Sequence, residues 1–293
     1  MDAKESWTRY WKTGQTHSCF AGGQPFDNRP VWAGFLDSLP AKARILDLAC
    51  GAGALTRLAA AHSGGYAVTG VDYADGLPEI SGAVLHEGVA LEALPFADAG
   101  FDAVISQFGL EYADTGRAVP EAARVLRNGG KFAVLAHAAD GEAVAAARNR
   151  VSRVAGLISE DGPVVLTRAY GHALEKGGAE PAKLEKIISI FHTEAARPQD
   201  ETTQWALGYL SEIISKHLQF PPPYLYENAQ TLLDELTGYV SRLERMDEAA
   251  FDSDGIAGLA GQVRAAGLEP EVPVSVSDAR GKPVGWWLSA MKS

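Results

Sequence analysis

Residues 44–53, with the sequence RILDLACGAG, combine a predicted strand, an acid and a glycine turn. Apolar residues at three of the first five positions suit a parallel strand that is covered on both faces. Gly51 and Gly53 allow a tight turn and the close approach of a ligand to the backbone. The helix predicted at 54–61 begins with unpaired amide N–H groups beside this loop. The stretch therefore predicts a ligand-binding loop in an α/β fold.

Two acids indicate which ligand this loop binds. Asp47 would repel a pyrophosphate and attract an ammonium group, unlike the acid-free loop of a dinucleotide site. Asp72 ends a second apolar strand, about 20 residues after the loop, where an acid meets ribose hydroxyls. A ligand with an amino-acid end and a nucleoside end fits this pair, which describes S-adenosylmethionine. The alternative is an ordinary α/β turn with two incidental acids.

Further motifs follow in a fixed order. They are LDLACGAG at 46–53, LPFADAGFDAV at 94–104 and EAARVLRNGG at 121–130. Together with the acid after the second strand, they resemble the class I S-adenosylmethionine-dependent methyltransferases, in the branch that acts on small molecules. The resemblance covers residues 30–140 and, more weakly, 256–293. It does not cover the middle of the chain.

The pattern predicts a doubly wound α/β fold with a seven-stranded Rossmann-like sheet. Helical segments alternate with five apolar segments, which implies a parallel sheet. Two further strands near the C-terminus are joined by a link too short for a helical crossover, so they must pair antiparallel. The resemblance implies the strand order 3-2-1-4-5-7-6. The predicted strands are 43–48, 66–71, 83–87, 101–106, 130–136, 271–277 and 284–290.

The predicted domains are a cofactor-binding core of residues 1–140 and 255–293, with an N-terminal helical flap, and an insertion of residues 141–254. Apolar residues at helical spacing predict a helical lobe between strands five and six. We expect a lid or substrate lobe over the mouth of the sheet, where ligands bind in open α/β folds. A stability or dimerisation lobe is the alternative. The predicted helices of the insertion are 184–191, 203–217, 226–236 and 239–245.

Composition restricts the class of partner. A net charge of −11 over 293 residues argues against a nucleic-acid substrate, because phosphate binding needs clustered basic residues. Cys19 and Cys50 form no disulfide framework, and the histidines lack metal-ligand spacing. Because residues 1–5 lack an apolar core and no 18 apolar residues run together, we expect neither a signal peptide nor a membrane span. We therefore expect a cytoplasmic protein without a metal or membrane partner, acting on a small molecule or short peptide.

The resemblance implies roles for the residues at the cofactor end. Asp47 would accept a hydrogen bond from the methionine ammonium group, directly or through water. Asp72 would hold the ribose hydroxyls. Tyr73 would pack on adenine, or it is a simple sheet-edge residue. The predicted cofactor-binding residues are Asp47, Ala49, Cys50, Gly51, Gly53, Asp72, Tyr73, Ala90, Leu91 and Gln107.

The sequence departs from the family pattern at two places. Ala90 or Leu91 stands where members often have an acid that reads the adenine amino group. Adenine recognition would then depend on backbone groups or on Glu87 or Glu92. Ala49 replaces a common glycine, and we expect its methyl group to be tolerated.

We predict the acceptor end from residues that follow strands four and five. His137 closes strand five and is predicted to be the catalytic base or a substrate contact; alternatively it caps the strand. The aromatic segment 7–11 would form a flap or an amphipathic helix packed on the fold. The predicted substrate-binding residues are Trp11, Phe108, Glu111 and Tyr112.

These features predict a methyltransferase that uses S-adenosylmethionine to methylate an oxygen or nitrogen atom. The competing prediction is a non-catalytic partner subunit that retains the fold, motivated by the missing adenine acid. A homodimer remains open.

Overall fold

The computed structural model describes residues 3–12 and 27–293 and divides into two compact units. The sheet unit comprises Met1–Ala145 and Arg245–Ser293, and the helical unit comprises Ala146–Glu244. Parts of the chain on both sides of the helical unit thus build the sheet unit.

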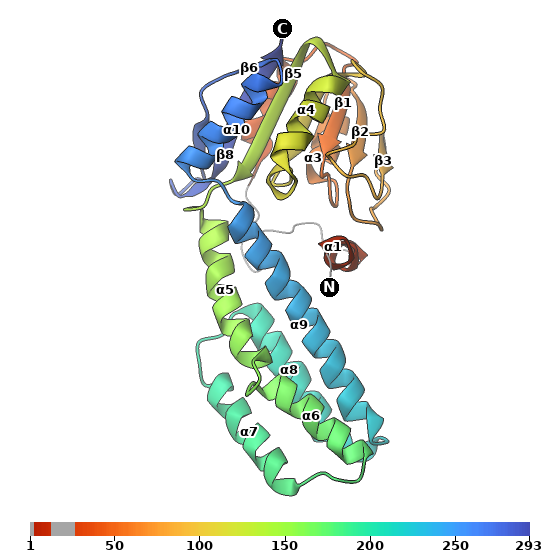
Figure 1. Cartoon of the computed structure of the whole chain (residues 1–293), viewed down its shortest axis with the longest axis vertical. Coiled ribbons are helices and arrows are strands. Elements are labelled where there is room, and N and C mark those ends of the chain that lie inside the picture. The colour runs from red at the N-terminus through yellow and green to blue at the C-terminus, as the bar shows by residue number, and fades with distance from the viewer. Residues whose placement is uncertain (1–2, 13–26) are drawn as a thin grey trace. The chain divides into compact units, whose positions relative to one another are not determined.

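The sheet has the strand order β3-β2-β1-β4-β5-β8-β6, and β7 also pairs with β8 (Figure 1). The first five strands pair in parallel, whereas β8 is antiparallel to β5, β6 and β7. This confirms the predicted doubly wound fold and its strand order. The strands are β1 Arg44–Leu48, β2 Ala67–Val71, β3 Ala83–His86, β4 Phe101–Gln107, β5 Leu126–His137, β6 Leu268–Pro270, β7 Val274–Ser277 and β8 Pro283–Lys292.

The strand predicted at 271–277 is wrong in extent. Of these residues only 274–277 form a strand, β7, and a separate short strand, β6, precedes them at Leu268–Pro270. Both pair with successive parts of β8, so the described sheet has eight strands and not the predicted seven. Pro273 lies between them and has no N–H group to donate to the ladder, which accounts for the interruption.

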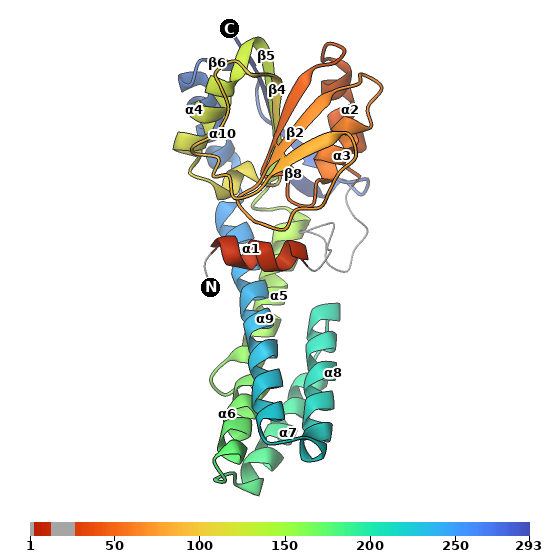
Figure 2. The same ribbon diagram turned by 90° about the vertical axis from the view of Figure 1, so that its right-hand side faces the viewer.

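Helices cover both faces of the sheet. Figure 2 shows α4 and α10 against one face and α2 and α3 against the other. Side chains alternate between the two layers: Leu46 and Leu48 pack beneath α4 and α10, and Ile45 packs beneath α2 and α3. The helices of this unit are α1 Ala3–Lys12, α2 Arg29–Asp37, α3 Ala54–Ala60, α4 Thr115–Val125 and α10 Ser253–Ala265, with the short 3-10 helix η1 Leu110–Tyr112.

Two charged residues of α4 fix the loop that precedes β4. Arg124 donates to the carbonyl oxygens of Leu94 and Phe96, at 3.0 and 2.7 Å. Glu121 accepts from the Leu94 amide at 2.8 Å and pairs with Arg124 at 2.7 Å. The motifs at 94–104 and 121–130 are therefore linked by direct contacts.

The helical unit has its own apolar core, formed by residues of α5 to α9. The prediction of two helices at 226–236 and 239–245 is wrong, because α9 continues through both. Glycine costs about 1 kcal/mol in a helix interior, and the buried Leu232, Leu236 and Leu243 on either side of Gly238 offset that cost. The role of this unit as a lid stays a prediction. Its helices are α5 Glu142–Ile158, α6 Pro163–Glu175, α7 Pro181–Ala195, α8 Glu201–Lys216, the short 3-10 helix η2 His217–Gln219 and α9 Pro223–Ala249; α5 begins and α9 ends in the sheet unit.

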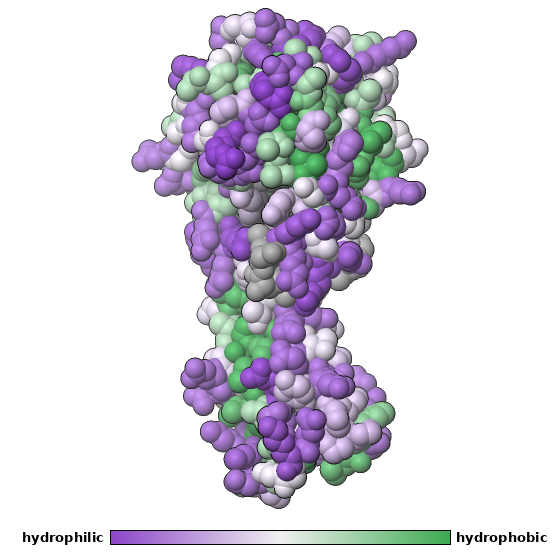
Figure 3. Space-filling view, turned by 45° about the vertical axis from the view of Figure 1, so that its right-hand side comes forward, coloured by the Kyte–Doolittle hydropathy of each residue, from purple (hydrophilic) through white to green (hydrophobic). Residues whose placement is uncertain are grey.

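Figure 3 shows hydrophilic side chains over the visible surface of each unit, with smaller apolar patches between them. None of the helices in the described part of the chain combines the length and apolarity needed to cross a bilayer.

Candidate functional site

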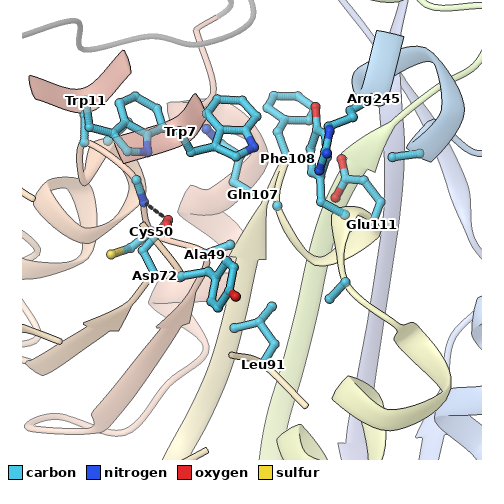
Figure 4. Close-up of a pocket in the computed structure, with 18 of the residues that line it drawn as sticks. Trp7, Trp11, Ala49, Cys50, Asp72, Leu91, Gln107, Phe108, Glu111 and Arg245 are labelled. Carbon is cyan, nitrogen blue, oxygen red and sulfur yellow. Dashed lines mark hydrogen bonds between the residues drawn. The ribbon is translucent and has the colours of Figure 1, made fainter. Parts of the chain in front are cut away.

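A cavity of about 1280 Å³ opens in the sheet unit, beside the carboxyl ends of β1, β2 and β4. Figure 4 shows Asp72 and Trp11 at one end, Glu111 and Arg245 at the other, and Trp7 between them. This is the place where open α/β sheets bind ligands, and the volume is large for a single small molecule.

The loop at residues 49–53, here called the glycine loop, forms one wall. Gly51 has φ +50°, and a Cβ there would lie 2.6 Å from the Trp11 ring. Glycine is therefore required both by the backbone and by the close approach of α1. Ala49 also adopts the left-handed region, with φ +52°, where an alanine is strained. The loop presents its backbone to the cavity through residues 49–52.

Asp72 follows β2, lines the cavity and is only 8% exposed. Its two carboxylate oxygens accept hydrogen bonds from the amides of Gly51 and Ala74, each at 2.8 Å. Burial raises the pKa of this carboxyl group, and the backbone hydrogen bonds partly offset the rise. Each oxygen keeps a second lone pair, so Asp72 can still accept from the hydroxyls of a ligand.

Asp47, predicted to accept from a ligand's ammonium group directly or through water, is not among the residues that line the cavity. Asp47 lies behind the cavity wall, 1% exposed, and its Oδ2 accepts from the Thr56 hydroxyl at 2.6 Å. Burial raises its pKa to about 7. Gly53 also lies behind the wall, where a Cβ would collide with Ile80 at 2.0 Å. A contact between Asp47 and a ligand through water remains a prediction.

The wall next to the glycine loop contains Tyr73, Ala90, Leu91 and Glu92. Of the two acids considered for adenine recognition, Glu92 lines the cavity and also accepts from the Asp114 amide at 2.8 Å. Glu87 is not part of the lining and instead accepts from the amides at positions 76 and 77. Glu92, and not Glu87, therefore lines the cavity in which adenine would bind.

Two residues at the end of β4 face the cavity from a constrained backbone. Phe108 has φ +53°, which is rare for a bulky residue and typical of functional sites. Its amide donates to the Leu135 carbonyl at 2.7 Å, which holds this conformation. The side-chain oxygen of Gln107 accepts from Asn28 and Trp32, both at 2.7 Å.

Glu111 and His137 form a buried pair at the far end. Glu111 Oε1 lies 2.7 Å from His137 Nδ1 and accepts from the His137 amide at 3.0 Å. Glu111 lines the cavity, whereas His137 is 1% exposed and does not line it. The structure thus places His137 behind Glu111, and its role as the catalytic base or a substrate contact stays a prediction.

The aromatic segment at 7–11 is a helix that also lines the cavity, which combines both interpretations of it. The Trp7 and Trp11 rings stack at 5.7 Å, and Trp7 meets the edge of Tyr112 at 5.8 Å. Cys19 lies outside the described residues. In the described part of the chain, no group of three or more His, Cys, Asp or Glu residues could hold a metal ion.

The cavity brings together most of the predicted site residues and adds several outside the predicted set, since their positions depend on the fold. Predicted residues in the lining are Trp11, Ala49, Cys50, Gly51, Asp72, Tyr73, Ala90, Leu91, Gln107, Phe108, Glu111 and Tyr112. Lining residues absent from the predicted site set include Trp7, Asn28, Arg29, Arg57, Arg245 and Glu248.

A family model described as a methyltransferase domain matches residues 46–134. Residues 46–134 are therefore similar to a methyltransferase domain. Its range contains the three motifs at 46–53, 94–104 and 121–130, so the resemblance drawn from them is confirmed there. The matched segment also contributes most of the residues that line the cavity.

Curated relatives match over the same part of the chain. An uncharacterized methyltransferase of Mycobacterium tuberculosis is 38% identical over 102 residues, or 33% of this chain and 41% of the relative. A demethylmenaquinone methyltransferase of Thermus thermophilus is 39% identical over 102 residues, or 31% and 46%. The chain thus spans about two fifths of the length of the curated relatives it matches.

Solved structures are more distant. An S-adenosylmethionine dependent methyltransferase from Mesorhizobium loti is similar over 90% of this chain and 97% of its own, with 13% identity and a TM-score of 0.46.

Proposed function

We propose that the protein is an S-adenosylmethionine-dependent methyltransferase that acts on an oxygen or nitrogen atom of a small molecule or short peptide. The observation that carries this proposal is Asp72, a buried carboxylate that lines the cavity and is held by the Gly51 amide. A buried acid at the end of the second strand, fixed against a glycine loop, suits the hydroxyl pair of a ribose.

The lining residues fit this cofactor. Asp72 would accept from the ribose hydroxyls, and the open backbone of the glycine loop would follow the methionine chain. Tyr73 and Leu91 offer apolar surface to the adenine ring. The mycobacterial and Thermus relatives are themselves named methyltransferases, which supports the same assignment.

Catalysis would depend mainly on alignment. When bound, the cofactor supplies a methyl group on a positively charged sulfur, which is already activated for transfer. The residues of this chain then hold the two reactants in line, which can contribute several kcal/mol to lowering the barrier. Trp11 packs on Gly51 of the glycine loop, and the Trp7 ring stacks on Trp11.

Calorimetry with S-adenosylhomocysteine tests the proposal. We expect a dissociation constant in the micromolar range or tighter. Methyl-labelled S-adenosylmethionine, incubated with the protein and a pool of small metabolites, should then pass its label to the small-molecule fraction. Absence of heat with either form of the cofactor would overturn the proposal.

A second candidate is a non-catalytic partner subunit with the same fold. The observation that favours it is the apolar pair Ala90 and Leu91 in the cavity wall, where an acid would otherwise read adenine. Stoichiometric cofactor in mass spectra of the purified protein, together with label transfer, would exclude this candidate. Bound cofactor without any transfer would support it.

A further inference from the structure

Glu111 has a carboxylate oxygen that the described fold leaves without a partner. Its side chain is 0% exposed, and no hydrogen-bond partner for Oε2 exists among the described residues. An unsatisfied buried polar group costs about 1–3 kcal/mol. Since Glu111 lines the cavity, a ligand that donates a hydrogen bond there would recover this cost.

The other oxygen of Glu111 is fully used. Oε1 meets both the amide and the ring Nδ1 of His137, and a carboxylate requires that Nδ1 carry the proton. The Phe108 ring lies 4.4 Å from the His137 ring and limits its movement. The carboxylate is therefore held in one orientation before any ligand arrives, as an effective binding site requires.

The surroundings of Glu111 favour a flat ring as the remaining part of the ligand. Phe108 and Tyr112 line the cavity next to it, and Trp7 meets the edge of Tyr112. Arg245 lies at the same end (Figure 4), and no ion pair joins it to Glu111 within the described residues. Within the described residues, Oε2 of Glu111 thus has neither a hydrogen-bond donor nor a cation as its partner, and a ligand donor reaches this buried oxygen only by displacing the side chains that cover it.

We propose that Glu111 is a catalytic residue that binds the N–H or O–H group of the methyl acceptor through Oε2, with His137 as its positioning residue. The acceptor is a compact ring compound that carries an amine or hydroxyl group. This inference rests on the proposed function and names the acceptor class for the same site.

The proton balance of the reaction gives Glu111 a second task. The acceptor nitrogen or oxygen forms a bond to the methyl carbon, and the bond from that carbon to sulfur breaks with its electron pair left on sulfur. The acceptor's proton passes to Oε2 of Glu111, which is within reach only because the oxygen has no other partner.

Binding of three ring compounds of similar size tests the inference: benzylamine, benzyl alcohol and ethylbenzene. Dissociation constants are measured by ligand-observed NMR on the full chain saturated with S-adenosylhomocysteine. We expect the two donors to bind at least about tenfold more tightly than ethylbenzene, which corresponds to about 1.4 kcal/mol. Glu111→Gln should reduce the preference for benzylamine to about twofold or less.

Matched variants separate this role from a structural one. Glu79→Gln, which changes an exposed glutamate outside the cavity lining, should retain the preference. His137→Asn keeps a side-chain N–H for Glu111 and should also retain it, whereas His137→Leu should lose it.

Each outcome has a distinct meaning. A protein that binds no S-adenosylhomocysteine overturns the proposed function. If S-adenosylhomocysteine binds, three results would overturn this inference and leave the proposed function intact. Ethylbenzene binds as well as the donors, no probe binds, or Glu111→Gln keeps the preference. If that variant does not fold, the wild-type preference and the two His137 variants decide.

Discussion

The two ends of the cavity each contain a buried carboxylate, and the fold satisfies them differently. Asp72 receives backbone amides on both oxygens, one from Gly51 of the glycine loop and one from Ala74, two residues further on. Glu111 receives both of its hydrogen bonds on one oxygen, from the amide and the ring of His137 at the end of β5. The carboxylate at the cofactor end is therefore held by backbone amides, whereas the carboxylate at the acceptor end also depends on a side chain, the His137 ring.

The largest expected effect concerns a third buried acid, Asp47, whose pKa is raised from 3.8 to about 7. A raised pKa means that folding favours the protonated acid. The stabilisation that protonated Asp47 adds to the folded state is complete below pH 3.8 and is lost as pH rises to about 7. The free energy of unfolding should fall over this range by at most about 4 kcal/mol, at 1.36 kcal/mol per pKa unit.

Urea unfolding at several pH values, compared between wild type and Asp47→Asn, measures this contribution. The amide oxygen of the variant still accepts from Thr56 but does not ionise. The pH dependence should become shallower without disappearing, because the pKa of Asp72 is also raised. Identical slopes in the two proteins would contradict the buried position of Asp47.

The next effect tests the cofactor end directly. Asp72→Ala removes the carboxylate that holds Gly51 and Ala74, and charge-assisted hydrogen bonds contribute about 1.5–3 kcal/mol each. The dissociation constant for S-adenosylhomocysteine should rise about 100-fold, or ~2.7 kcal/mol. Asp75→Ala, which removes only an exposed ion pair with Lys4, is the control. It should change the dissociation constant for S-adenosylhomocysteine less than about twofold. Equal effects of the two changes would argue against Asp72 as a ligand contact.

Gly51→Ala probes the contact between α1 and the glycine loop. Its expected cost is about 2 kcal/mol of unfolding free energy, from a left-handed backbone and a clash with Trp11. Gly65→Ala has a similar φ of +65° and open space around it, so it should cost about 1 kcal/mol from the backbone alone. Adding Trp11→Ala to Gly51→Ala removes the clash, so it should recover the difference in unfolding free energy between the two glycine variants. If both glycine variants cost the same, Trp11 does not pack on the loop.

The smallest effect concerns the contacts that hold the loop before β4. Arg124→Lys cannot reproduce the hydrogen bonds to Leu94 and Phe96 together with the ion pair to Glu121. We expect a loss of about 1 kcal/mol in thermal or urea unfolding. The control is Arg117→Lys on the exposed side of the same helix, which should leave the unfolding free energy nearly unchanged. If Arg117→Lys lowers the unfolding free energy as much as Arg124→Lys does, the contacts of Arg124 have no special role.

This difference between the ends also explains what the sequence could predict. The strands and the loop at 49–53 follow from hydrophobic period and glycine position, and the family resemblance implied the strand order, so these features were predicted. The contact between Asp47 and Thr56 was not, because Thr56 reaches Asp47 from α3 and no local pattern shows that contact. His137 was placed at the correct edge of the sheet, but its orientation behind Glu111 depends on packing against Phe108.

The helical unit is the part of the chain for which the sequence predicted the least. Gly238 lies in the gap between the helices predicted at 226–236 and 239–245, and buried leucines on both sides carry α9 through it. Apolar spacing predicts helices there but no chemistry. The identity of the acceptor therefore has to come from the cavity, where side-chain geometry is informative.

A crystal structure of the complex with S-adenosylhomocysteine tests the division of the cavity most directly. We predict the ribose hydroxyls on Asp72 and the thioether sulfur turned toward the end that contains Glu111. A ligand that binds in the opposite direction, with its nucleoside against Glu111, would contradict the account.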